Sequence, residues 1–349
     1  MLSTYNLELA NKCMYMYIHC MCCFIPAVFM HLFSSPLRKY SIHEIVLALN
    51  TTMSTAQVNN LKDLSTDEEY YQRVYDVFET VCDRREKMYE WICNDLPAVV
   101  DSIETGPGRA LNVLSVGAGN GVIDIKMMSV LLVNHPLIHA TILEPNPNVL
   151  QQYKALASKE SAKLQGVSFE WRAETFDEYQ KITNKERKFH FISCMSSIYY
   201  MGDLEPALQC LHGELDTGGI LMVSLMSGEG GFGSLWQFLH KKFGRRGDLF
   251  TSSDVIEVSR KLNLNISVVQ NFIYHCDLSA CFGPPEELSE EASILLDFLT
   301  HTIGFARNAS ADCRDDVMRF LRSDACSDRG PLGQVILKGN NVAVFIRHE

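Results

Sequence analysis

The chain lacks the excess of basic residues that a nucleic-acid-binding protein uses to release counterions. Its 349 residues include 31 Lys and Arg against 42 Asp and Glu, so the formal net charge is −11. We therefore expect no nucleic acid partner and favour a small molecule. Glycine (21 residues) and proline (11 residues) are few and follow no period, which excludes collagen-like and low-complexity chains. A hydrophobic content of 47% provides a sizeable core, and the length predicts roughly two domains or one large core with an appended lobe.

Paired cysteines are also lacking in the body of the chain. Four of the 12 cysteines crowd the first tenth of the sequence, and none of the other eight belongs to a C-x-x-C pair. A chain of this length does not need disulfides for stability, so we expect reduced thiols in a cytoplasmic protein. Metal ligands at short spacing are lacking as well, and we expect no metal.

Residues 1–52 differ from the rest of the chain. The run from Cys13 to Phe33 is apolar and about long enough to span a bilayer, yet it contains Pro26. Three interpretations remain open: a signal anchor, a leader foreign to the native protein, or a disordered apolar tail. We favour a dispensable leader outside the fold, because Met53 begins a polar stretch typical of a cytosolic N-terminus. A membrane partner is expected only if the apolar run is a real anchor.

Strand-like and helical patterns alternate between residues 110 and 228. The strands are predicted at 110–116, 138–143, 167–171, 189–194 and 220–225, and the helices at 122–132, 147–158 and 203–215. Alternation of this kind predicts βαβ units, and therefore an α/β fold with a mainly parallel sheet and helices on both faces. Before this region, residues 67–96 show the spacing of one or two amphipathic helices.

The alternation stops after residue 227, which divides the body into three parts. Residues 53–228 are expected to form the core with N-terminal covering helices. Residues 229–332 are expected to form a smaller substrate lobe inserted late in the sheet. Residues 333–349 are expected to return to the core as the final strand.

A glycine-rich turn is the sharpest signal in the sequence. Gly117, Gly119 and Gly121 follow a predicted strand and precede a predicted helix, where glycine lets a backbone approach a ligand closely. A dinucleotide fingerprint needs its third glycine at position 122, which is Val122, so a nicotinamide dehydrogenase is disfavoured. The G-x-G-x-G spacing resembles the cofactor turn of class I S-adenosylmethionine-dependent methyltransferases, whose fold is Rossmann-like.

An acidic residue stands where a second cofactor contact is expected. Glu144 ends the next predicted strand, 27 residues after Gly117, and a carboxylate there can accept hydrogen bonds from ribose hydroxyls. The alternative is a strand-end acid that only caps the following helix. Together the two features predict a nucleotide-type cofactor outside the carboxyl ends of the strands.

Several segments from residue 67 to the C-terminus resemble histamine N-methyltransferases in order and spacing. They include LSVGAGNGVIDI, LEPNPNVLQQYKAL, FEWRAETFDEYQ, FHFISCMSSIYYM, SGEGGFGSLW, LLDFLTHTIGF and GNNVAVFI. The resemblance implies a cytosolic transferase, here a divergent one, that moves a methyl group from S-adenosylmethionine to a ring nitrogen of a small imidazole amine. We expect a monomer.

The resemblance also assigns cofactor positions. Gly117 would lie against the methionine part of the cofactor, and Glu144 would hold its ribose. Three further positions depart from the family pattern: a glutamine, a serine and an isoleucine of the family stand here as Val149, Phe176 and Met195. These departures alter the expected contacts with adenine and leave the glycine turn intact.

The expected substrate-binding positions differ from the family pattern more strongly than the cofactor positions do. The family's acidic residue for the amine falls on Arg84, with Glu79, Asp83 and Glu86 as neighbours that could serve in a shifted helical register. The expected catalytic positions are Asn341, Tyr200 and Ser196, the last standing where the family has glutamine. The expected substrate contacts are Tyr71, Phe78, Arg84, Phe232, Trp236 and Phe298.

Each of these residues also has an ordinary structural interpretation. Aromatic residues at helical spacing are most often core, Asn341 could cap a turn, and Arg84 could be a solvated charge on a helix. Two alternatives to the histamine-type function therefore stay open. One is a methyltransferase fold that binds its cofactor with weak or no activity. The other is a methyltransferase for a carboxylate-bearing amine, if Arg84 faces the site.

Overall fold

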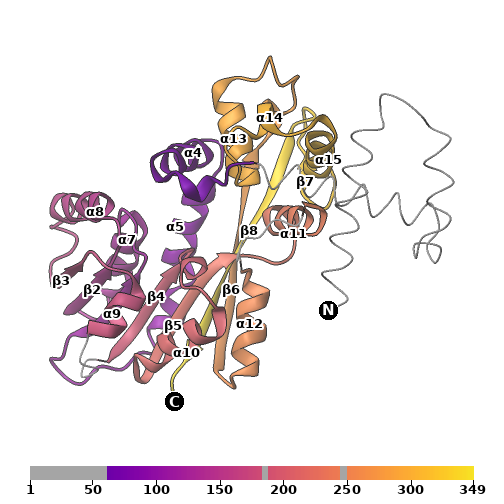
Figure 1. Ribbon diagram of the computed structural model, residues 1–349. Coiled ribbons are helices and arrows are strands. Elements are labelled where there is room, and N and C mark those ends of the chain that lie inside the picture. Colours follow the sequence, from indigo (N-terminus) through magenta and orange to yellow (C-terminus); the bar gives the residue numbers. More distant parts are fainter. Residues whose placement is uncertain (1–60, 183–187, 244–249) are drawn as a thin grey trace, which may run out of the picture. The chain divides into compact units, whose positions relative to one another are not determined.

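The computed structural model describes residues 61–182, 188–243 and 250–349 and shows one eight-stranded mixed sheet (Figure 1). Its order is β3-β2-β1-β4-β5-β8-β6, with the short β7 paired to β8. The strands are β1 (Leu111–Val116), β2 (Ile138–Leu143), β3 (Val167–Arg172), β4 (Phe189–Met195), β5 (Leu215–Met226), β6 (Asn265–Asp277), β7 (Ser327–Arg329) and β8 (Val335–Arg347). The predicted class I methyltransferase fold, a mainly parallel Rossmann-like sheet, is confirmed.

The first five strands are parallel, and their order reverses between β1 and β4. The carboxyl ends of β1 and β2 are in register, with Val116 opposite Leu143. Ligands of such sheets bind outside the carboxyl ends of the strands at the reversal point. This topology places the glycine turn after β1 beside Glu144 after β2, as the sequence predicts.

The helices of the described residues cover both faces of this sheet and also gather above it. They are α4 (Glu68–Thr80), α5 (Arg84–Asn94), α6 (Pro97–Val100), α7 (Val122–Leu131), α8 (Pro147–Lys159), α9 (Phe176–Ile182), α10 (Leu204–Gly213), α11 (Gly231–Phe243), α12 (Ser252–Lys261), α13 (Glu290–Thr300), α14 (Phe305–Asn308) and α15 (Ala311–Leu321). The described residues also form the single 3-10 turns η2 (Leu64–Thr66), η3 (Ile198–Tyr200) and η4 (Ser279–Cys281).

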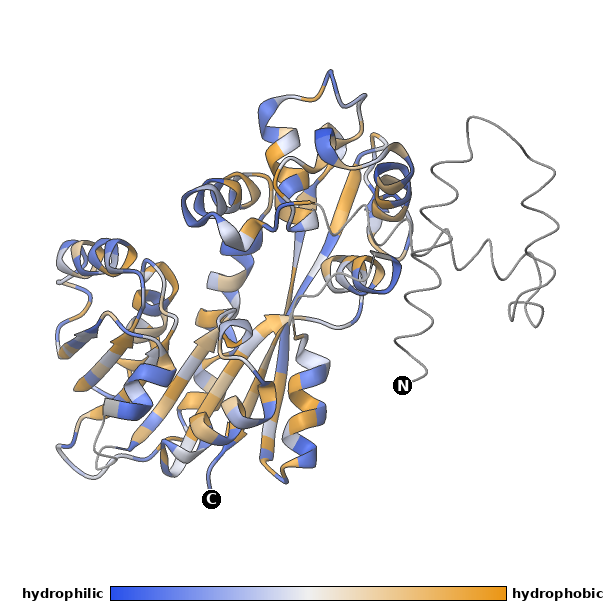
Figure 2. Cartoon of the chain, viewed as in Figure 1, coloured by the Kyte–Doolittle hydropathy of each residue, from blue (hydrophilic) through white to orange (hydrophobic). Residues whose placement is uncertain are grey.

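Two hydrophobic cores lie on opposite faces of the sheet, because successive strand residues point to opposite sides. On β1, Leu111 and Val113 join one core, whereas Leu114 and Val116 join the other. The central strands β1, β2, β4 and β5 are accordingly mostly apolar, and the helices carry polar residues on their outer faces (Figure 2). The first core continues without a break into the helices above the sheet.

Side-chain caps explain why several helices begin where they do. Asp67 accepts a hydrogen bond from Tyr70 N–H and starts α4, while Asn146 caps α8 directly before Pro147. Thr251 and Asp254 form a reciprocal capping box on α12. Each cap satisfies a backbone donor that the first turn of a helix otherwise leaves unpaired.

The segment expected to form a separate substrate lobe is divided in the structure. Within residues 229–332, α12 packs on the sheet and β6 is its edge strand, so neither belongs to a lobe. Helices α11, α13, α14 and α15 gather instead above the sheet, around the first half of β8 (Figure 1). The predicted boundary is therefore wrong for residues 252–277. The final strand does return to the core, because β8 lies between β5 and β6.

The predicted extension, residues 1–52, lies outside the described residues. The described residues, from 61 to 349, belong to one compact unit. None of the helices in the described ranges combines the length and the apolarity that crossing a bilayer requires.

Candidate functional site

The glycine turn after β1 is held in a conformation that favours glycine at three positions. Gly117, Gly119 and Gly121 have φ angles of 65°, 59° and 79°. A Cβ atom at Gly117 would lie 2.5 Å from Ser197 Cβ, and one at Gly121 would lie 2.1 Å from the Tyr153 ring. A Cβ atom at Gly119 would meet nothing within 4 Å. Two of the glycines therefore serve packing, and Gly119 borders open space where a ligand can approach the backbone.

Glu144 closes the gap between the ends of β1 and β2. Its Oε2 accepts a hydrogen bond from Gly119 N–H at 2.9 Å, and its Oε1 accepts one from Asn146 N–H at 3.0 Å. The residue is 8% exposed, and burial raises the pKa of its carboxyl against the lowering effect of these two bonds. A carboxylate has about four lone-pair sites, so two acceptor positions remain for a ligand.

A buried carboxyl supports the turn from beneath. Asp124, in the first turn of α7, accepts hydrogen bonds from the hydroxyls of Ser115 on β1 and Tyr153 on α8. Burial raises the pKa of Asp124 to about 7. This group ties three elements together below the glycines and is not exposed to the ligand side.

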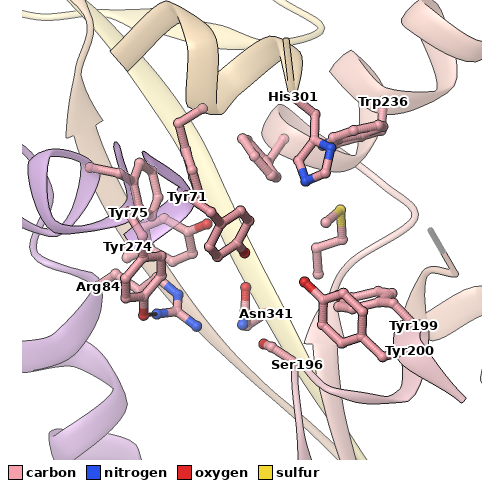
Figure 3. A pocket seen from close by; sticks show the side chains of 14 residues that line it. Tyr71, Tyr75, Arg84, Ser196, Tyr199, Tyr200, Trp236, Tyr274, His301 and Asn341 are labelled. Atoms are coloured by element: carbon pink, nitrogen blue, oxygen red, sulfur yellow. Dashed lines mark hydrogen bonds between the residues drawn. The ribbon is translucent and has the colours of Figure 1, made fainter. Parts of the chain in front are cut away.

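An aromatic cavity of about 100 Å³ lies beside the carboxyl ends of β4 and β5 (Figure 3). It is lined by Tyr71, Tyr75, Phe78, Arg84, Ser196, Tyr199, Tyr200, Met226, Phe232, Trp236, Tyr274, Phe298, His301 and Asn341. Its rings contact one another: Phe78 stacks on Phe298 with ring centroids 4.4 Å apart, and Trp236 meets His301 edge-on at 5.4 Å. Such a wall is largely apolar and suits a small planar molecule.

The cavity adjoins the glycine turn through two consecutive serines. Ser196 lines the cavity, and Ser197 donates a hydrogen bond from Oγ to Val116 O at 2.6 Å, directly before the turn. Ser196 has a φ angle of 52°, which is strained for a residue other than glycine. Strain of this kind persists only where the surrounding structure enforces it. One residue step thus separates the cavity wall from the cofactor turn.

Arg84 supplies the positive charge of the cavity. It is 8% exposed, and Nη1 donates to Tyr75 Oη at 3.0 Å and to Glu79 Oε1 at 2.9 Å. Its guanidinium points into the cavity toward Asn341 and Ser196 (Figure 3). Burial disfavours its charged form, but Tyr75 and Glu79 outweigh that effect, so the pKa of Arg84 lies above its usual value.

Glu79 is shared between Arg84 and Arg85, whose Nε donates to Oε2 at 3.0 Å. Two guanidinium groups and one carboxylate leave one positive charge in this cluster. The cavity lining contains no Asp or Glu among the residues that the structure describes. Of the acidic alternatives, Asp83 accepts from His275 N–H at 2.6 Å and Glu86 is exposed, so neither faces the cavity.

All predicted catalytic and substrate positions come together in this cavity. Asn341 on β8, Tyr200 in η3 and Ser196 after β4 line it with Tyr71, Phe78, Arg84, Phe232, Trp236 and Phe298. The interpretation of Arg84 as a solvated helix charge is wrong, because the residue is buried.

Sequence reasoning missed five lining residues: Tyr75, Tyr199, Met226, Tyr274 and His301. Tyr75 lies between Tyr71 and Phe78 at helical spacing, and this periodicity could have found it. Tyr274 and His301 have no such local signal.

The three expected cofactor residues that differ from the family pattern lie near the strand ends, in different environments. Val149 is partly buried in the first turn of α8, and Met195 is partly buried at the end of β4. Phe176 is 5% exposed and packs in the second core with Tyr179, at a ring distance of 6.4 Å.

Comparison with known proteins identifies a methyltransferase domain and related methyltransferases. A family model described as "Methyltransferase domain" matches residues 72–268. Histamine N-methyltransferase A of Xenopus laevis is 30% identical over 299 residues, which covers 82% of this chain and 98% of that protein. Carnosine N-methyltransferase 2 of Gallus gallus is 30% identical over 302 residues, which covers 83% and 89%. The solved plantazolicin methyltransferase BpumL, in complex with SAH, has a TM-score of 0.41 at 11% identity and covers 88% of this chain and 99% of that chain.

The sheet order, the glycine turn and the adjoining acid define a class I methyltransferase, the class whose methyl donor is S-adenosylmethionine. The chain belongs to the methyltransferase domain family, and within it to the histamine N-methyltransferase family as a divergent member.

Proposed function

We propose that this protein is a cytoplasmic S-adenosylmethionine-dependent N-methyltransferase that acts on a small imidazole amine. The observation that carries the proposal is the junction at Ser196 and Ser197, where the aromatic cavity adjoins the glycine turn. A cytoplasmic setting suits the eight described cysteines, all of which are free thiols.

The residues around the turn fit the cofactor. Gly119 borders open space, and Glu144 keeps acceptor positions for ribose hydroxyls next to it. We assign Val149 and Met195 to the same site, because they lie in the first turn of α8 and at the end of β4, and Phe176 packs in the core that contains Val116 and Leu143 at the ends of β1 and β2. When bound, S-adenosylmethionine supplies an electrophilic methyl group.

The chain's own residues must then hold a neutral nitrogen in line and exclude water, because orientation accounts for much of the rate of such a displacement. The Asn341 amide offers a donor and an acceptor, which can fix an imidazole ring through its N–H and leave the other nitrogen free. The hydroxyls of Tyr200 and Ser196 can add uncharged hydrogen bonds. The rings of Phe78, Phe298 and Trp236 keep solvent away from the reacting side.

The direct test uses the full chain with methyl-labelled S-adenosylmethionine and histamine, followed by mass analysis of the product. We expect an N-methylated imidazole and saturation with both substrates. Cofactor binding in a calorimeter without methylated product from any imidazole amine would instead favour the binding-protein alternative. Failure to bind the cofactor at all would overturn both the methyltransferase proposal and the binding-protein alternative.

A second candidate acceptor is an imidazole amine that also bears a carboxylate, such as carnosine. Arg84 favours it, because the cavity contains a buried guanidinium whose Nη2 and Nε make no hydrogen bond with the described residues. A guanidinium pairs with carboxylates in a fork geometry and repels the ammonium group of histamine. We therefore expect a higher kcat/KM for carnosine than for histamine.

The substitution Arg84→Gln tests this candidate. Removing one partner of a buried charge pair costs about 2–5 kcal/mol, so kcat/KM for carnosine should fall by about 30-fold or more, whereas that for histamine should rise or stay. Arg85→Gln is the matched control, because Arg85 pairs with the same Glu79 from outside the cavity. Equal or better turnover of histamine by the unsubstituted protein would remove the carboxylate preference.

A further inference from the structure

The connection between α4 and α5 pairs with β6 like a short antiparallel strand. Asp83 N–H donates to His275 O at 3.1 Å, and Asp277 N–H donates to Val81 O at 3.1 Å. Cys82 and Cys276 lie opposite each other between these two bonds. They therefore form a non-hydrogen-bonded pair, in which Cα atoms are about 4.5 Å apart. That separation falls within the range that a disulfide bridges, about 4.4–6.8 Å.

The two thiols differ in exposure and in acidity. Cys82 is partly exposed, whereas Cys276 is fully buried. A side-chain hydrogen bond from Cys276 lowers the pKa of the Cys82 thiol, and the same contact raises the pKa of Cys276. A more acidic and more accessible thiol facing a buried partner is the arrangement of an attacking and a resolving cysteine.

We propose that Cys82 and Cys276 are a modification site, at which a small-molecule disulfide such as oxidised glutathione drives formation of a reversible intramolecular disulfide. The Cys82 thiolate attacks the small disulfide, forms a mixed disulfide and releases one thiol. The Cys276 sulfur then attacks Cys82, its proton passes to the departing thiol, and the protein disulfide forms. Two thiols are oxidised and one external disulfide is reduced to two thiols.

This disulfide would fix two walls of the aromatic cavity to each other. Cys82 stands two residues before Arg84, and Cys276 stands two residues after Tyr274. It would also close a long loop between residues 82 and 276, which restricts the unfolded chain strongly. Oxidation should therefore raise the melting temperature of the folded protein.

The experiment oxidises the full chain with oxidised glutathione and maps peptides without reduction. We expect a cross-linked peptide pair containing Cys82 and Cys276, lighter by two hydrogen atoms than its parts and released by dithiothreitol. The melting temperature of the oxidised protein should exceed that of the reduced protein by several degrees.

Matched variants separate this bridge from other thiol chemistry. Cys82→Ser should abolish both the cross-link and the melting shift, and because Cys82 is partly exposed this variant should fold even if Cys276→Ala does not. Cys281→Ala, a buried thiol off the bridge, and Cys210→Ser, an exposed one, should retain both effects. Glutathione adducts only on exposed Cys93 and Cys210, or a bridge between Cys276 and Cys281, would overturn the proposal.

Discussion

Gly119 combines a left-handed backbone with open space on the ligand side of the turn. We predict that Gly119→Ala weakens S-adenosylmethionine binding by at least tenfold, because the new methyl group occupies the space that the cofactor must enter. The left-handed φ adds about 1–2 kcal/mol of strain to the folded state. Calorimetric titration measures the affinity, and urea unfolding measures the stability.

The control for this substitution is Gly108→Ala. Gly108 has a φ angle of 71° and likewise no atom within 4 Å of an added Cβ, but it lies in the loop before β1. The Gly108→Ala variant should lose about as much stability as Gly119→Ala without losing affinity for the cofactor. Equal affinities of the two variants would contradict a ligand-facing role for Gly119.

Asp124 gives the core an unusual dependence on pH. Burial raises its pKa to about 7, from an ordinary value of 3.8, so the folded state retains a proton that the unfolded state has lost. The contribution of Asp124 to the free energy of unfolding is full below about pH 4 and declines as the pH rises toward 7. Asp124→Asn, which stays neutral, should remove this decline, and at pH 8 the variant should be more stable than the parent by up to about 4 kcal/mol.

Urea unfolding at several pH values between 4 and 8 measures this effect. Ser115→Ala removes the hydroxyl whose hydrogen bond lowers the pKa of Asp124, so it should extend the decline to higher pH. Parallel stability profiles for parent and Asp124→Asn would show that the carboxyl does not titrate in this range.

Arg84 illustrates how far single residues could be predicted. The resemblance assigned position 84 to the substrate side, yet Glu79, Asp83 and Glu86 competed with it because a shift in register exchanges their faces. The register is set by the break between α4 and α5, where residues 81–83 pair with β6. This long-range pairing leaves no local trace in the sequence.

Among the elements, α4 is held above the cavity by one buried carboxylate of α13. Asp297 accepts hydrogen bonds from Tyr70 Oη at 2.8 Å, from Gly304 N–H at 2.6 Å and from Phe305 N–H at 2.8 Å. We predict that Asp297→Ala lowers the unfolding free energy by about 2–4 kcal/mol, since it leaves buried donors unpaired. Thermal unfolding monitored by circular dichroism measures the loss.

Tyr70→Phe is the informative companion, because it removes the Tyr70–Asp297 bond and leaves both the backbone bonds to Asp297 and the Arg73–Glu290 ion pair between α4 and α13. Its loss should be about 1 kcal/mol, with a rise in KM for the acceptor as α4 loosens over the cavity. A loss as large as that of Asp297→Ala would mean that the two backbone bonds contribute little.

The bounds of helices and strands were predictable from the sequence where the sequence pattern is local. They were less predictable for the long strands, whose extent depends on pairing with distant residues. The helices at α7 and α8 and the strand at β2 were expected within a residue or two of their observed ends. The last strand was expected within residues 333–349, although Lys338, Gly339, Asn340 and Asn341 interrupt its apolar pattern. Pairing with β6 along its whole length makes it one strand, and the same pairing brings residues 265–277 into the sheet.

At the scale of the whole molecule, the cavity is a product of the complete fold. Its lining extends from Tyr71 to Asn341 and comes from four of the sheet's strands or their ends, four helices and η3. The glycine turn and Glu144, in contrast, lie within residues 111–146, although Tyr153 and Ser197 pack against the turn from outside this range. A local sequence pattern therefore predicted where the turn lies. The cavity lining was predicted only where the family resemblance supplied it, because no short pattern records which distant elements meet.

Because both sites share this single fold, ligand binding should stabilise the molecule as a unit. At a concentration 100 times its Kd, S-adenosylmethionine should add about 2.7 kcal/mol to the unfolding free energy and raise the melting temperature by several degrees. Glu144→Ala should abolish most of this shift, since it removes the acceptor beside Gly119. Glu160→Ala, at the far end of α8, should retain the shift in full. A shift of equal size in both variants, measured by calorimetry at matched ligand concentration, would place the cofactor away from the ends of β1 and β2.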